Sequence, residues 1–238
     1  MSVLELKYSG KWIQVKTWIA TAIALLFHIA GAIGIVWYNR GLFLSATALN
    51  LFLMFLLLIW TQGKPAGSFL RFLLICFVLG MLVEVVGTRT GWLFGEYRYG
   101  KVLGPRFMQV PLVIGLNWFV IGFCMGALVD KCVAIFSTFF RTVVPGWVEW
   151  LLKSIKIVAG ALGFLIFDRV MEKPAVAMGY WEWLNNSGPA LLNSVSWMGM
   201  GLVLMALYER SDFRKGNQFA VHLIVIQFLF FLFLHMML

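Results

Sequence analysis

Charged side chains are scarce in this chain of 238 residues. Only 12% of the residues are Asp, Glu, Lys or Arg, whereas 62% belong to the apolar set AVILMFWYC. A soluble domain has about 25% charged and about 45–50% apolar residues, so the composition excludes a soluble domain. Three cysteines are too few for a disulfide scaffold, and the apolar content excludes a disordered or collagen-like chain. The chain is therefore predicted to be a polytopic membrane protein.

Acidic residues are the rarer charged class, with 10 Asp and Glu against 19 Lys and Arg, which gives a formal net charge of +9. The basic residues are scattered over the loops and form no single basic face, so we expect no nucleic-acid partner. In a membrane protein such an excess usually determines topology and contacts anionic lipid headgroups.

Metal and cofactor motifs are also missing. The sequence has no Cys-x-x-Cys, no His-x-x-x-His and no phosphate-binding loop. His222 and His235 lie about 220° apart around a helix, at about 100° per residue, and so face different ways. We expect neither a metal site nor a cofactor.

Segments of about 20 uncharged or weakly charged residues are long enough to cross about 30 Å of hydrocarbon. We predict an all-α fold in which residues 1–238 form a single membrane domain. Twelve Lys and Arg lie on the side of the N-terminus and seven on the opposite side, which predicts a cytoplasmic N-terminus. The seven predicted spans cover residues 17–37, 41–60, 69–88, 107–129, 151–171, 187–208 and 216–238.

Carboxylates inside membrane spans are costly and indicate function by default. Glu84 and Asp168 each lie about one turn before the end of a predicted span, and these two spans run in the same direction. We therefore expect both carboxylates at similar depth, near the face opposite the N-terminus. Glu172 shares a helix face with Asp168 at i, i+4, and is interpreted as a boundary charge.

Glycines flank Glu84 on one helical stripe, at positions 80, 87 and 91. Small residues there either allow another helix to approach closely or leave space for a ligand beside the acid. The structural alternative is a helix contact in which Arg89 or Arg169 pairs with Glu84.

Two of the eleven tryptophans, Trp118 and Trp197, lie near the middle of predicted spans, whereas most of the others lie at span ends. Each has an amide on its own helix, Asn117 and Asn193. Buried aromatic faces can line an apolar ligand or stabilise a cation, and the alternative is that both rings are simply core.

Two blocks of sequence carry a family resemblance. The first reads EVVGTRTGWLFGEYRYGKVLG from Glu84 to Gly104 and continues with Val110-Pro111 and Asn117-Trp118; the second contains Asp168, GYWEW over residues 179–183, Pro189, Asn193 and Trp197. Together they resemble the carotenoid biosynthesis membrane family that includes the carotenoid 1,2-hydratases. Gln109 departs from this pattern, because a glycine is expected before Val-Pro.

The resemblance implies an enzyme of a prokaryotic plasma membrane that adds water across the C1–C2 bond at the acyclic ψ-end of a carotene, giving a tertiary alcohol without a cofactor. Such chemistry needs an acid, and a carboxyl group in a low-dielectric site can stay protonated near neutral pH. Glu84 and Asp168 are the catalytic candidates. The implied substrate-binding residues are Phe94, Tyr97, Tyr99, Asn117, Trp118, Trp181, Trp183, Asn193 and Trp197.

Two alternatives stay open at this point. A carotene end-group cyclase uses the same protonation but captures the cation internally, and a non-catalytic protein binds carotenoid or lipid without turnover. In each case the partners are a carotenoid from the lipid phase and membrane lipid, with other carotenoid pathway enzymes in addition. For a long apolar substrate we expect an apolar cleft that opens to lipid and has the carboxylates at its blind end.

Overall fold

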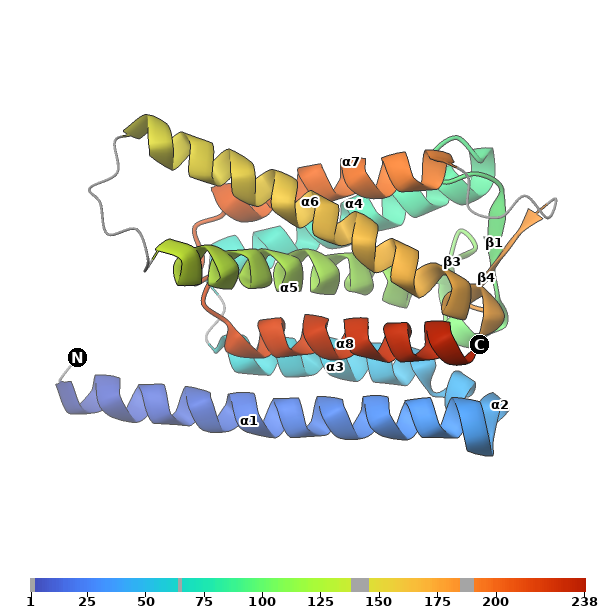
Figure 1. Ribbon diagram of the computed structural model, residues 1–238, viewed down its shortest axis with the longest axis horizontal. Helices are drawn as coiled ribbons and strands as arrows, with labels where there is room; N and C mark the ends of the chain where they lie inside the picture. The colour runs from blue at the N-terminus through green and yellow to red at the C-terminus, as the bar shows by residue number, and fades with distance from the viewer. Residues whose placement is uncertain (1–2, 64–65, 138–145, 185–190) are drawn as a thin grey trace.

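The computed structural model describes residues 3–63, 66–137, 146–184 and 191–238. The long helices lie side by side along one axis, and the strands gather at the end of the bundle away from the N-terminus (Figure 1). The all-α fold of a polytopic membrane protein is confirmed. The helices are α1 (Val3–Ile33), α2 (Arg40–Ser45), α3 (Thr47–Gln62), α4 (Gly67–Thr90), α5 (Leu112–Ser137), α6 (Gly146–Ala177), α7 (Leu191–Arg210) and α8 (Gln218–Met237).

In these described ranges, six helices are long and apolar enough to cross a membrane, namely α1 and α4 to α8. Helix α3 has 16 residues, about 24 Å at about 1.5 Å per residue, which is short of the about 30 Å hydrocarbon core. The number of spans, seven, therefore stays a prediction.

The predicted span 41–60 is broken in the structure. Helix α1 continues through one π-helical segment (Gly34–Tyr38), and the chain then turns at Asn39, whose side chain accepts a hydrogen bond from the backbone N–H of Leu42 at 3.1 Å. The short α2 precedes α3, and no proline or charge marks the break between them. After this break Thr47 stands at the start of α3, where its hydroxyl forms a hydrogen bond with the hydroxyl of Tyr180 at 3.2 Å.

The predicted span 107–129 begins too early. Strands β2 (Arg106–Phe107) and β3 (Val110–Pro111) form an antiparallel pair, and α5 starts only after it. Met108 and Gln109 form the two-residue turn, with φ of 49° and 71°. Positive φ at both central residues defines the type I′ hairpin turn, in which glycine is unstrained. This explains in physical terms why a glycine is expected where Gln109 stands.

Helix α5 is the centre of the bundle. It packs against α3, α4, α6, α7 and α8, and 78% of its most apolar stretch is buried, compared with 39% or less in the other five long helices. Helix α1 lies at the edge of the bundle, where it contacts α3 and α8 (Figure 1). The outward faces of the peripheral helices are apolar, which is typical of helices in lipid.

A second pair of strands joins two distant connections. Strand β1 (Tyr97–Tyr99) pairs with β4 (Trp181–Trp183) in antiparallel register, and a short 3₁₀ turn (Lys101–Leu103) follows β1. Because side chains alternate along a strand, the two tyrosines and two tryptophans lie on one face. Arg98 and Glu182 form an ion pair on the other face.

Gly100 closes this strand pair against the end of α6. Its N–H donates to the carbonyl of Tyr180 at 2.8 Å, and a Cβ at this position would lie 1.9 Å from the carbonyl oxygen of Gly179. We expect Gly100→Ala to lower stability by about 1–3 kcal/mol, because backbone atoms must move. The melting temperature in detergent measures this. Gly67→Ala is the control, since no atom lies within 4 Å of its added Cβ. Equal melting temperatures for the two variants would contradict the close contact.

Candidate active site

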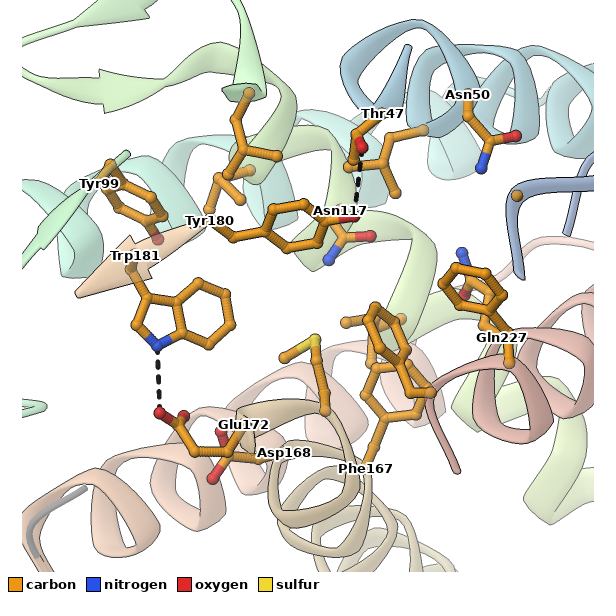
Figure 2. A pocket seen from close by; sticks show the side chains of 18 of the residues that line it. Thr47, Asn50, Tyr99, Asn117, Phe167, Asp168, Glu172, Tyr180, Trp181 and Gln227 are labelled. Carbon is orange, nitrogen blue, oxygen red and sulfur yellow. Dashed lines mark hydrogen bonds between the residues drawn. The ribbon is translucent and has the colours of Figure 1, made fainter. Parts of the chain in front are cut away.

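A cavity of about 420 Å³ lies inside the bundle (Figure 2), with walls from all of the long helices, from α2 and α3, and from strands β1 and β4. The eleven side chains singled out from the sequence as catalytic or substrate-binding all line it. They are Glu84, Phe94, Tyr97, Tyr99, Asn117, Trp118, Asp168, Trp181, Trp183, Asn193 and Trp197. The two candidate catalytic carboxylates thus share one site.

Glu84 accepts hydrogen bonds from three side chains. The Tyr97 hydroxyl and the Tyr99 hydroxyl, the latter at 2.7 Å, both donate to Oε2, and the indole N–H of Trp118 donates to Oε1 at 3.0 Å. The ion pair with Arg89 or Arg169, the structural alternative, is not formed. Donors of this kind stabilise a buried carboxylate without a counter-charge.

The glycines beside Glu84 make room for these donors. A Cβ at Gly80 would lie 2.6 Å from the Trp118 ring, and one at Gly87 would lie 3.2 Å from the Tyr97 hydroxyl and 2.7 Å from the ring of Phe94, which packs beside it. Gly91 instead ends α4 in a left-handed conformation, with φ of 67°. The glycine stripe therefore allows aromatic side chains to pack closely against α4, and these side chains fill the space beside the glycines that a ligand would need.

The inner face of the strand pair supplies donors to two carboxylates. Strand β1 directs its tyrosine hydroxyls at Glu84, while the indoles of Trp181 and Trp183 on β4 donate to Oε1 of Glu172 at 3.1 and 2.6 Å. Glu172 is 8% exposed and lines the cavity. Its interpretation as a boundary charge is wrong, because the strand pairing folds two tryptophans over it.

Asp168 has a buried carboxylate oxygen that accepts no hydrogen bond from the described residues. Its Oδ2 accepts from the side-chain amide of Asn193 at 2.9 Å, whereas its Oδ1 is buried and has no hydrogen-bond partner in the described part of the chain. Arg169, the next residue, donates to the hydroxyl of Ser194 at 2.6 Å. Asp168 therefore has one carboxylate oxygen whose hydrogen-bonding capacity no described residue uses.

Trp118 and Trp197 pack against each other with ring centroids 4.6 Å apart, and Phe164 lies against both rings. Both tryptophans line the cavity and also belong to the core, so both interpretations drawn from the sequence, a ligand-lining role and a core role, apply to them. They form an aromatic wall next to Glu84.

The exposed lining residues of the cavity all lie on one side of the described protein, on α1 and around the start of α3. They are Leu26, Phe27, Ala30, Ala46 and Leu49. The opening is therefore apolar and lies between two helices, as expected for a cleft that faces lipid, and the acids lie deeper.

Several lining residues were not singled out as site residues from the sequence. Tyr180 lies inside the GYWEW block, and its hydroxyl bonds to Thr47 (Figure 2). Asn50 and Gln227 stand in uncharged apolar segments, where an isolated carboxamide is itself a signal. Pro189, part of the resemblance, lies outside the described residues.

These features define a polytopic membrane protein with three buried acids in a cavity that opens on an apolar face. Residues 42–238 match the family described as carotenoid biosynthesis protein, and the chain belongs to this family. The match begins in α2 and leaves out α1.

A relative in Haloarcula japonica, bisanhydrobacterioruberin hydratase, is 28% identical to this chain over 205 residues. The aligned region covers 82% of this chain and 66% of the relative, slightly under two thirds of its length. No solved structure matches the chain. The comparisons thus support an enzyme of carotenoid biosynthesis related to a hydratase.

Three cavity tyrosines stay protonated to unusually high pH. Burial, together with the nearby Glu84 carboxylate, raises the pKa of Tyr97 and of Tyr99 well above the usual value of about 10, and burial raises the pKa of Tyr180 to about 12. We expect the variants Tyr97→Phe, Tyr99→Phe and Tyr180→Phe to show the same tyrosinate absorbance change as the unsubstituted protein when the folded proteins are titrated up to about pH 11. In denaturant all tyrosines titrate, so the absorbance change of each variant should be smaller by one sixth, because the chain has six tyrosines. A smaller change in a folded variant would contradict the burial of that hydroxyl.

Proposed function

We propose that this protein hydrates the acyclic ψ-end of a carotene, adding water across the C1–C2 double bond to give a tertiary 1-hydroxy carotenoid. The observation that carries the proposal is the buried, unpartnered Oδ1 of Asp168 in a cavity with an apolar opening. The family and the hydratase relative support the same reaction class.

In the proposed mechanism Asp168 is the general acid. Its proton passes to C-2, the π electrons of the C1–C2 bond form the new C–H bond, and a tertiary cation remains at C-1. A water oxygen then bonds to C-1, and the proton that this water releases returns to the Asp168 carboxylate. Bonds and charge balance, and Asp168 ends the cycle in its starting state.

Glu84 has a different role in this proposal. A carboxylate has about four lone-pair sites, and three donors already occupy three of them. We therefore assign Glu84 to electrostatic stabilisation of the cation, with Trp118 and Trp197 as the aromatic wall beside it. The sequence left open which of the two carboxylates protonates C-2 and which orients the attacking water, with Glu84 slightly favoured as the acid; its three donors leave little capacity for either role.

The carotene is proposed to enter from the lipid phase between α1 and α3. A cavity of about 420 Å³ is in the range of pockets for drug-sized ligands, so it suits one end of a carotene, with the remaining polyene in the opening. The excess of Lys and Arg on the N-terminal side supports a cytoplasmic N-terminus in a prokaryotic plasma membrane. Enzymes that supply or consume the carotene are further proposed partners.

Isosteric substitutions test the catalytic assignment. We expect Asp168→Asn and Glu84→Gln each to reduce hydration by about 10²–10⁴-fold, because they keep the side-chain shape but remove the acid or the charge. The measurement is the pigment mass in a lycopene-producing host, since hydration adds one water and cyclisation leaves the mass unchanged. Glu149→Gln, an exposed change on α6, is the control. Near-normal hydration by both cavity variants would show that the roles are assigned wrongly.

Bulk at the opening tests the entry path. Ala30 lines the cavity, whereas its exposed neighbour Ile29 does not. We expect Ala30→Trp to slow hydration of a carotene by about tenfold or more through a raised KM, because a large side chain in the opening obstructs the polyene. A short acyclic isoprenoid with the same end group should be hydrated as before. If Ile29→Trp has the same effect, or if both substrates are slowed equally by Ala30→Trp, the opening lies elsewhere.

A further inference from the structure

Two carboxamides in the cavity wall have unused acceptors. Asn50 on α3 and Gln227 on α8 both line the cavity, and the side-chain oxygen of each is buried without a hydrogen-bond partner among the described residues. Gln227 is 4% exposed. Both side chains lie on the side of the pocket away from Tyr99 and Trp181 (Figure 2).

An unpaired buried carbonyl oxygen is costly. A leucine or a methionine would fill the same space as either side chain without an unpaired polar atom. A carboxamide oxygen needs a hydrogen-bond donor, which the hydrocarbon part of a polyene does not have. The neighbouring lining residues on α8, Phe230 and Phe231, also provide no donor side chain. The chemical group that fits this pair of acceptors is a hydroxyl.

We propose that Asn50 and Gln227 form a hydroxyl-binding subsite of the cavity. This inference rests on the proposed hydration. The hydroxyl has two possible sources, the water that adds to C-1 or an alcohol group that the carotenoid already carries.

The two sources have different consequences for the reaction. A bound water donates one O–H group to a carboxamide oxygen of the subsite; its lone pair forms the C–O bond to C-1, and the proton of its other O–H group leaves to the Asp168 carboxylate. A carotenoid hydroxyl only donates a hydrogen bond, and no bond to it forms or breaks. In the first case the subsite acts on every substrate, and in the second only on a hydroxylated one.

The test uses Asn50→Leu and Gln227→Met with two substrates in D₂O, an acyclic hydrocarbon carotene and the same carotene hydroxylated at its other end. We expect each variant to lose hydration by about two- to tenfold, the order expected for one lost hydrogen bond. Loss with both substrates, together with deuterium in the recovered carotene, assigns the subsite to water, because the cation then loses a proton instead of being captured. Loss with the hydroxylated carotene alone, as a raised KM, assigns it to the substrate hydroxyl.

Gln62→Met is the matched control, because Gln62 is buried on α3, the helix that also carries Asn50, but both its amide nitrogen and its oxygen have hydrogen-bond partners. Its amide donates to the carbonyl of Arg214 at 2.8 Å, and its oxygen accepts from Asn217 at 3.0 Å. We expect this variant to melt at a lower temperature and to hydrate normally per folded molecule. Gln227→Met should be at least as heat-stable as the unsubstituted protein.

Unchanged hydration of both carotenes by the two subsite variants would overturn the proposal. So would a loss of activity that only follows a loss of folded protein and leaves no deuterium in the carotene. Failure of the proposed function itself would appear differently, because the unsubstituted protein would then form no hydrated product from either carotene.

Discussion

The site depends on how a carboxylate is held inside a membrane protein without a positive partner. Glu84 is 6% exposed in the interior of the bundle, and its hydrogen-bond donors are two tyrosines and one tryptophan. Neutral donors of this kind satisfy the oxygens but leave the charge uncompensated. In the proposed mechanism this negative charge is available to the cation in the cavity, whereas an arginine at the same place would neutralise it.

The strand pair extends the same arrangement to a second acid. Because β1 and β4 pair in register, one small face carries the hydroxyls that bind Glu84 and the indoles that bind Glu172. A shift of one residue in this register would turn the donors outward and the Arg98–Glu182 ion pair inward. The geometry at both acids thus depends on one pairing in the connections, outside the membrane helices. Asp168, which takes its partner from α7, is independent of that pairing.

The sequence predicts the helices well, because an uncharged stretch of about 20 residues has a single stable form in lipid. It also identifies Glu84 and Asp168, since an acid in such a stretch is conspicuous. The break before α3 and the late start of α5 are missed, because neither changes hydropathy. The alternation in Tyr97–Tyr99 and Trp181–Trp183 is visible in the sequence, but the pairing of strands more than 80 residues apart follows only from the packing of α4 and α6 around α5. The same packing determines which side of each helix faces the cavity, and for this reason Asn50 and Gln227 could not be assigned in advance.

The distances along the chain between each acid and its donors bear on how the protein is made. Glu84 finds its donors 13, 15 and 34 residues later, and Glu172 finds its own 9 and 11 residues later. The strand pair joins the two groups through Arg98 and Glu182, which are 84 residues apart. During synthesis each acid can therefore be satisfied by its own half of the chain soon after that half enters the bilayer. Neither acid therefore needs a hydrogen-bond donor from the other half of the chain, and the strand pairing fixes the geometry of both sets of donors when the two halves dock.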